Sequence, residues 1–257
     1  MANRLLLPLL LFLASSLGVA QEITVAAAAD LQFAFQDVAA RFEKSTGHGV
    51  KLTFGSSGNF FSQIQNGAPF DVFCSADVDY PRKLEAADLT EPGTLYWYAT
   101  GKIVVWALRG SKLDLSRGVR ALLDPSVAKI AIANPQHAPY GRAAVAALQH
   151  EGIYDQVSPK FVIGENISQT ASFVASGSAD VGIIALSLAL APSMTEKGKY
   201  AEIPAEEYPA IEQAAVVLKA SSHKEAARQF LDYLKTPAIL ELMKKYGFSL
   251  PGTGAGH

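Results

Sequence analysis

The first pattern along the chain is a run of apolar residues at its N-terminus. Residues 1–20 read MANRLLLPLLLFLASSLGVA, with Arg4 ahead of an apolar core from Leu5 to Leu13 and small residues at the end. A bilayer span needs about 20 apolar residues, whereas this run is shorter and is interrupted by Pro8. The pattern predicts a cleaved signal peptide over residues 1–20 and export to a periplasm.

Beyond this segment, short apolar runs alternate with stretches whose apolar residues recur every three to four positions. Leu31, Phe35, Val38 and Phe42 share one face of a predicted helix. Strands are predicted at residues 22–28, 50–54, 71–74, 102–108, 130–133, 161–163, 181–184 and 213–218. Helices are predicted at residues 31–46, 59–66, 79–87, 141–150, 168–176 and 222–246, the last with a second start at residue 237.

This alternation predicts an α/β protein of two lobes, each a mostly parallel sheet flanked by helices, with a ligand cleft between them. The first lobe is expected to hold residues 21–101 together with about 210–257, and the second residues 102–209. The 22 Lys and Arg residues balance 24 Asp and Glu residues, so the chain lacks the basic surface of a nucleic-acid-binding protein. The single cysteine excludes an intramolecular disulfide.

The loops that follow the predicted strands are polar and rich in glycine. Each precedes a helix, whose first N–H groups and positive dipole end suit an anion. Ser56 and Ser57 would add hydroxyl donors, and Gly55 and Gly58 would let the backbone approach a ligand. Taken alone, each loop is equally well explained as an ordinary helix cap and turn. The loops are residues 29–30, 55–59, 134–141 and 164–168.

Four longer stretches carry a family resemblance. Between residues 23 and 251 they read ITVAAAADL, FGSSGNFFSQIQNGAPFDVFCSAD, ANPQHAPYGRAA and FVIGENISQTASFVASGSADVGIIALS. In sequence and order the chain resembles the periplasmic molybdate-binding proteins of ABC transporters. The resemblance implies a periplasmic-binding-protein fold whose lobes close on molybdate or tungstate, without enzyme activity or a resident cofactor. It also implies a monomeric receptor that serves a membrane permease with a cytoplasmic ATPase.

The resemblance assigns the oxyanion to four residues: Asp30, Ser57, Tyr140 and Ile167. Ser57 would use its hydroxyl and its backbone N–H. Tyr140 and Ile167 would act through their backbone N–H groups, so their side chains could vary. Molybdenum would be met only as the oxyanion, through these same residues. Some relatives add a tyrosine within the segment that reads GIIALS here, but this chain has Ala185, so that contact is absent or replaced.

Asp30 departs from the family pattern, because relatives place serine or asparagine at this position. An ionised carboxylate only accepts hydrogen bonds and would repel a dianion. The favoured explanation is that Asp30 caps the following helix and turns its carboxylate toward the helix amides. The alternative is that Asp30 accepts a hydrogen bond from a protonated oxyanion, which would make the ligand phosphate or arsenate.

A different class of function is a serine hydrolase with Ser57 as nucleophile. Such a serine needs a base within hydrogen-bond reach, and His137 is the one histidine in a predicted site loop. The sequence contains no G-x-S-x-G elbow, no phosphate-binding P-loop and no H-E-x-x-H motif. We therefore expect a binding protein rather than an enzyme.

Overall fold

A computed structural model describes residues 20–250. The signal peptide predicted at residues 1–20 thus lies outside the described residues except for its last position. Between residues 20 and 250 the structure contains no helix that is both long and apolar enough to span a membrane.

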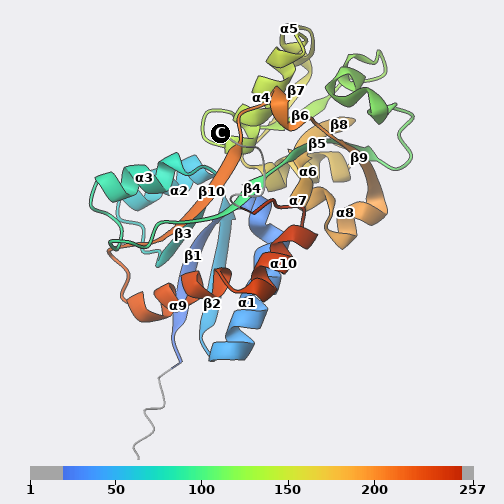
Figure 1. Cartoon of the computed structure of the whole chain (residues 1–257). Coiled ribbons are helices and arrows are strands. Elements are labelled where there is room, and N and C mark those ends of the chain that lie inside the picture. Colours follow the sequence, from blue (N-terminus) through green and yellow to red (C-terminus); the bar gives the residue numbers. More distant parts are fainter. Residues whose placement is uncertain (1–19, 251–257) are drawn as a thin grey trace, which may run out of the picture.

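The strands form two five-stranded sheets (Figure 1). The first sheet contains β1 (Glu22–Ala28), β2 (Gly49–Gly55), β3 (Val72–Ser75), β4 (Tyr96–Gly101) and β10 (Ile211–Val217). The second contains β5 (Ile103–Leu108), β6 (Ile130–Ala133), β7 (Phe161–Gly164), β8 (Val181–Ala185) and β9 (Gly198–Glu202). We call the first sheet with its helices the first lobe, and the second sheet with its helices the second lobe.

The helices lie between and around these strands. Those of the first lobe are α1 (Gln32–Thr46), α2 (Ser57–Gln65), α3 (Asp79–Ala86), α9 (Lys224–Leu234), α10 (Pro237–Lys245) and the 3₁₀ turn η1 (Ala29–Leu31). Those of the second are α4 (Pro139–His150), α5 (Tyr154–Val157), α6 (Ile167–Ala175), α7 (Leu186–Ala189), α8 (Pro192–Lys197) and the 3₁₀ segments η2 (Leu115–Leu123), η3 (Ser158–Lys160) and η4 (Ala205–Glu207).

The strand order is β2-β1-β3-β10-β4 in the first sheet and β7-β6-β8-β5-β9 in the second. In the first sheet only β10 runs against the other strands, and in the second only β5 does. The predicted α/β fold with mostly parallel sheets is therefore confirmed. Each reversed strand is the first one after the chain passes between the sheets, from β4 to β5 and from β9 to β10 (Figure 1).

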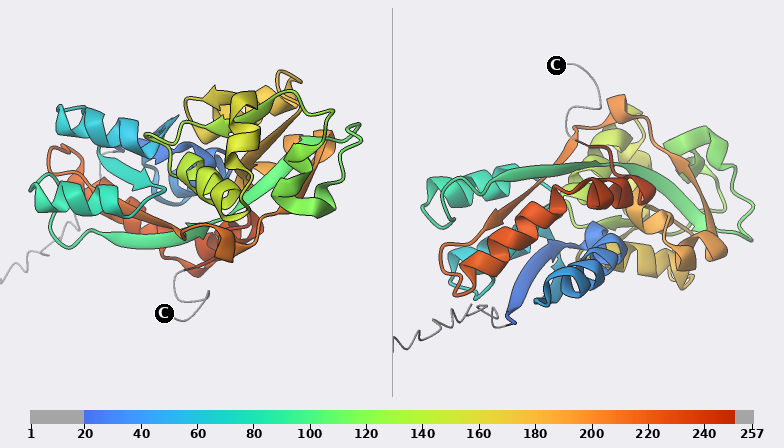
Figure 2. Two further views of the ribbon diagram at one scale, coloured as in Figure 1. Left: turned by 90° about the horizontal axis from the view of Figure 1, so that it is seen from above. Right: turned by 60° about the horizontal axis from the view of Figure 1, so that its bottom comes forward.

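Helix α1 shows how the sequence pattern becomes a core. Phe35, Val38 and Phe42 are fully buried, as their helical spacing predicts. The Phe42 ring meets the rings of Phe230 and Tyr233 edge-on, with centroids 5.3 and 5.4 Å apart. In the right-hand view of Figure 2, α1, α9 and α10 lie together beside the first sheet, so this aromatic cluster joins the two ends of the described chain.

Candidate functional site

The loops singled out in the sequence meet at one small cavity between the lobes. Asp30 and Ser57 reach it from the first lobe, and Tyr140 and Ile167 from the second. The structure thus brings all four predicted residues together, while their contacts with a ligand stay a prediction. The complete lining is Ala28, Ala29, Asp30, Gly55, Ser56, Ser57, Ala76, Ala138, Pro139, Tyr140 and Ile167.

The cavity is small and almost free of charge. It offers about 10 Å³ to the centre of a water-sized molecule, which is room for one small group and not for a sugar or a peptide. Among the described lining residues, Asp30 is the only Asp, Glu, Lys, Arg or His. Hydrogen-bond donors, rather than cationic side chains, would therefore have to hold an anion here.

Ser57 is placed as a donor. Its hydroxyl oxygen accepts a hydrogen bond from the backbone N–H of Ala76, at 2.9 Å, so its proton can be donated elsewhere. Ser57 and Tyr140 both occupy the first turn of their helices, α2 and α4. Backbone N–H groups in a first turn have no acceptor within the helix, so those of Ser57 and Tyr140 can be donated to a ligand.

The start of α6 leaves one backbone N–H for the cavity. The side chain of Asn166 caps this helix by accepting from the N–H groups of Ser168 and Gln169, both at 3.0 Å. The N–H of Ile167, the first helical residue, does not donate to this cap. Because Ile167 lines the cavity, a bond from this N–H to a ligand there stays a prediction that the cap does not obstruct.

The predicted capping role of Asp30 is wrong. The N-cap of η1 is Ala28, and Asp30 lies inside the 3₁₀ turn. Its side chain is buried, and its Oδ2 accepts hydrogen bonds from the Tyr140 hydroxyl at 2.9 Å and from the Gln213 amide at 2.7 Å. These donors come from the second lobe and from β10, so closure of the lobes, rather than local capping, sets the carboxylate's surroundings.

Burial also changes the acidity of this carboxyl group. Loss of water raises the pKa of Asp30 from its ordinary 3.8 to about 6, although the hydrogen bonds from Gln213 and Tyr140 lower it. The pKa of the Tyr140 hydroxyl lies well above its ordinary value because the group is buried and faces Asp30. Tyr140 therefore stays protonated and remains a donor to the carboxylate.

Two features of this network were not predicted. The side chain of Tyr140 is not free to vary, because its hydroxyl bonds Asp30 and also accepts from Gln213 Nε2 at 3.0 Å. Gln213 itself was missed as a site residue. Its Oε1 accepts from the Tyr98 hydroxyl at 2.9 Å, which orients the amide so that Nε2 points to Asp30. The available signal was a polar residue at the head of the buried run QAAVVL.

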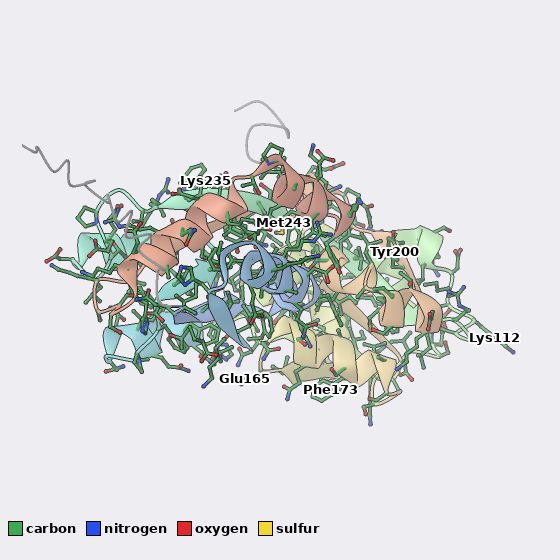
Figure 3. The ribbon with its side chains drawn as sticks, turned by 90° about the horizontal axis from the view of Figure 1, so that it is seen from below. Lys112, Glu165, Phe173, Tyr200, Lys235 and Met243 are labelled. Carbon is green, nitrogen blue, oxygen red and sulfur yellow. The ribbon has the colours of Figure 1, made fainter. Side chains whose placement is uncertain are left out.

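Further contacts hold the lobes together at the rim of the cavity. The backbone N–H of Gly58 donates to the carbonyl of His137 at 2.9 Å. The side-chain amide of Asn59 donates to Glu165 at 2.6 Å, and Figure 3 shows Glu165 where the two lobes meet. Gly58 was expected to approach a ligand, but it approaches the backbone of the opposite lobe instead. The two lobes are therefore in direct contact at the rim of the cavity.

The arrangement of Ser57 and His137 does not fit the serine hydrolase alternative. Nδ1 of His137 lies 2.9 Å from the Ser56 hydroxyl, whereas Ser57 Oγ is paired with the amide of Ala76. The serine and base that the alternative requires are thus not partners. The described residues also contain no group of three or more His, Cys, Asp or Glu side chains that could hold a metal ion.

Comparisons with known proteins agree with this architecture. The ModA molybdate-binding protein of Rhodobacter capsulatus is 40% identical over 231 residues, which cover 90% of this chain and 89% of that protein. ModA of Azotobacter vinelandii is 41% identical over 231 residues, covering 90% and 91%. The solved structure of the periplasmic molybdate-binding protein of A. vinelandii is similar with a TM-score of 0.84 at 35% identity, over 89% of this chain and 99% of that one.

A family model described as bacterial extracellular solute-binding protein matches residues 23–249, which is nearly all of the described chain. The two sheets, the cavity between them and the relatives above lead to the same assignment. The chain belongs to the family of bacterial extracellular solute-binding proteins.

Proposed function

We propose that this protein is the molybdate receptor of an ABC transporter, and that tungstate is a second ligand. The observation that supports the proposal is that Ser57, Tyr140 and Ile167, which carry uncharged groups able to donate, line one small cavity from both lobes. Relatives about 40% identical are named as molybdate-binding proteins. The protein is a binding protein and not an enzyme, and molybdate is its cargo rather than a cofactor.

The cellular setting is part of the same proposal. The predicted signal peptide over residues 1–20 would be removed on export, and the receptor would work in the periplasm as a monomer. It would deliver the anion to a membrane permease coupled to a cytoplasmic ATPase. Residues 21–101 with about 210–257, and residues 102–209, would move as two lobes that open and close around the site.

About six hydrogen bonds to the anion would make tight binding energetically feasible. A hydrogen bond to a charged group contributes about 1.5–3 kcal/mol, so about six give a gross of about 9–18 kcal/mol. Association costs on the order of 4–15 kcal/mol. A net of about 8 kcal/mol, which corresponds to a dissociation constant near micromolar, lies within the range that these two figures allow.

Calorimetric titration with molybdate, tungstate, sulfate and phosphate tests the proposal. We expect molybdate and tungstate to bind at sub-micromolar concentrations, and sulfate to bind more weakly because it is smaller than a site whose donors are fixed on backbone. Tight phosphate binding with poor molybdate binding at neutral pH would instead make this a receptor for a protonated oxyanion such as phosphate or arsenate.

The same titration tests the assigned donor. Ser57→Ala removes a hydroxyl that can be donated to the anion, so we expect molybdate affinity to fall by about 1.5–3 kcal/mol, roughly ten- to a hundredfold. Ser62→Ala is the matched control, because Ser62 lies on the same helix, α2, and is exposed. Equal affinities for the two variants would show that Ser57 is not a donor.

A further inference from the structure

One carboxylate oxygen in the cavity wall has no partner. Asp30 is 1% exposed, and its Oδ2 is occupied by the Tyr140 hydroxyl and the Gln213 amide. Its Oδ1 is buried and makes no hydrogen bond with any described residue. A buried charged oxygen without a partner is costly. Asp30 lines the cavity, so a ligand held there is the candidate partner for Oδ1.

Among residues 20–250, no cationic side chain bonds this carboxylate to balance a second anion. From α4 it meets the Tyr140 hydroxyl, and from β10 the amide of Gln213. From β4 the Tyr98 hydroxyl lies beyond Gln213, and from α7 the Ser187 hydroxyl donates to the backbone carbonyl of Asp30. All of these groups are neutral, and the buried tyrosines have pKa values well above the ordinary range.

The titratable and charged side chains at the rim of the cavity already have partners. His137 in the loop before α4 bonds Ser56 and lies 3.5 Å from Glu165, on the rim rather than in the lining. Arg142 of α4 pairs with Asp77 across the lobes. An ionised Asp30 would therefore face a dianion in a buried cavity with no compensating charge from the described lining, and the two would repel strongly.

On the basis of the proposed function, we propose that Asp30 binds the oxyanion as a neutral carboxylic acid whose proton sits on Oδ1, so that each dianion enters together with one proton. The hydrogen bonds to Oδ2 decide where the proton goes. Because Tyr140 and Gln213 both donate to Oδ2, that oxygen can only accept, and a proton on Asp30 must reside on Oδ1.

A proton on Oδ1 would give Asp30, which departs from the family pattern, the role of a hydrogen-bond donor to the anion. A protonated carboxyl offers one donor, as the serine or asparagine of relatives does, and adds no charge. Because burial already brings the pKa of Asp30 to about 6 without a ligand, protonation at neutral pH is within reach, and a bound dianion favours it further. Proton uptake is then a measurable property of binding.

Titration calorimetry of the full-length mature protein with sodium molybdate, in buffers of different ionisation enthalpy at pH 8, counts the protons taken up. We expect close to one proton per molybdate for the wild type. Between pH 6.5 and 8.5 molybdate stays a dianion, and we expect the wild-type affinity to fall roughly 50- to 100-fold, approaching tenfold per pH unit.

Asp30→Asn keeps the shape and supplies a permanent donor, so we expect no proton uptake and less than about a threefold change in affinity over the same range. His137→Gln is the control, because the His137 ring bonds Ser56, a residue of the cavity lining. This variant should retain the proton uptake. Uptake lost in His137→Gln but kept in Asp30→Asn would overturn the proposal. Molybdate binding by the wild type without proton uptake would also overturn this proposal, but it would leave the molybdate-binding function intact. A wild type that binds no molybdate at any of these pH values would refute the molybdate-binding function itself.

Discussion

Gly58→Ala is expected to abolish tight molybdate binding while leaving the protein folded. A Cβ atom at Gly58 would lie 2.8 Å from the carbonyl oxygen and 2.9 Å from the Cα of His137, both backbone atoms of the opposite lobe. Within α2 itself alanine is well tolerated, because it favours helix more than glycine does. The clash therefore acts only when the lobes close.

The size of the effect follows from the contacts that closure provides. An open protein would lose the donors of the second lobe, Tyr140 and Ile167, and each bond to a charged ligand contributes about 1.5–3 kcal/mol. We expect the affinity to fall by at least about a hundredfold. Small-angle scattering at saturating molybdate should show a larger radius of gyration for this variant than for the wild type.

Gly110→Ala is the matched control for this experiment, since a Cβ at Gly110 meets no atom within 4 Å. The control should bind and close as the wild type does. Wild-type affinity and radius in Gly58→Ala would mean that the approach of Gly58 to His137 is not required for ligand capture.

The second large effect is a dependence of stability on pH that is specific to Asp30. The carboxyl titrates near 3.8 in the unfolded chain and at about 6 in the folded protein. Below pH 3.8 Asp30 is protonated in both the folded and the unfolded protein, and its contribution to the free energy of unfolding is fully present. As pH rises from 3.8 to 6 the unfolded chain gives up its proton first, so the free energy of unfolding falls by about 1.4 kcal/mol per pH unit.

The full change is about 3 kcal/mol. It is measured as the difference between wild type and Asp30→Asn in urea unfolding without ligand, from pH 3.5 to 7. Asp71, whose pKa is lowered by hydrogen bonds from Ser221 and Thr24, acts in the opposite direction but in both proteins equally. A difference that does not change with pH would show that the Asp30 carboxyl is hydrated in the folded protein.

The spacing of apolar residues predicted those helices and strands whose burial follows from that spacing. Helix α1 was predicted because Phe35, Val38 and Phe42 repeat at helical spacing and Gly47 ends the helix in the left-handed conformation, with φ 77°. The reversed direction of β5 and β10 was not predicted, since an apolar run reads the same in either direction. Strand β9 was missed because the sequence GKYAE has only one fully buried position and little β-propensity.

The surroundings of Asp30 lie beyond any local rule. A polar residue between a strand and a helix usually caps the helix, and that rule produced the wrong expectation. Tyr140 and Gln213, which donate hydrogen bonds to its carboxylate, lie 110 and 183 positions further along the chain. They reach Asp30 only because β10 returns to the first sheet and α4 closes over it. The convergence of the four site residues was predictable through family resemblance, whereas this network needed the structure.

Gly101 joins the anion site to the connection between the lobes. It is the last residue of β4, and the chain leaves the first sheet directly after it. A Cβ there would lie 2.1 Å from the Tyr140 hydroxyl oxygen and 2.8 Å from Gln213 Nε2. The residues that bond Asp30 thus pack directly against the connection between the lobes, and under the proposed opening and closing the outer ends of the lobes would move furthest. A fluorescent reporter of molybdate should carry its dyes at those outer ends and keep position 101 without a side chain.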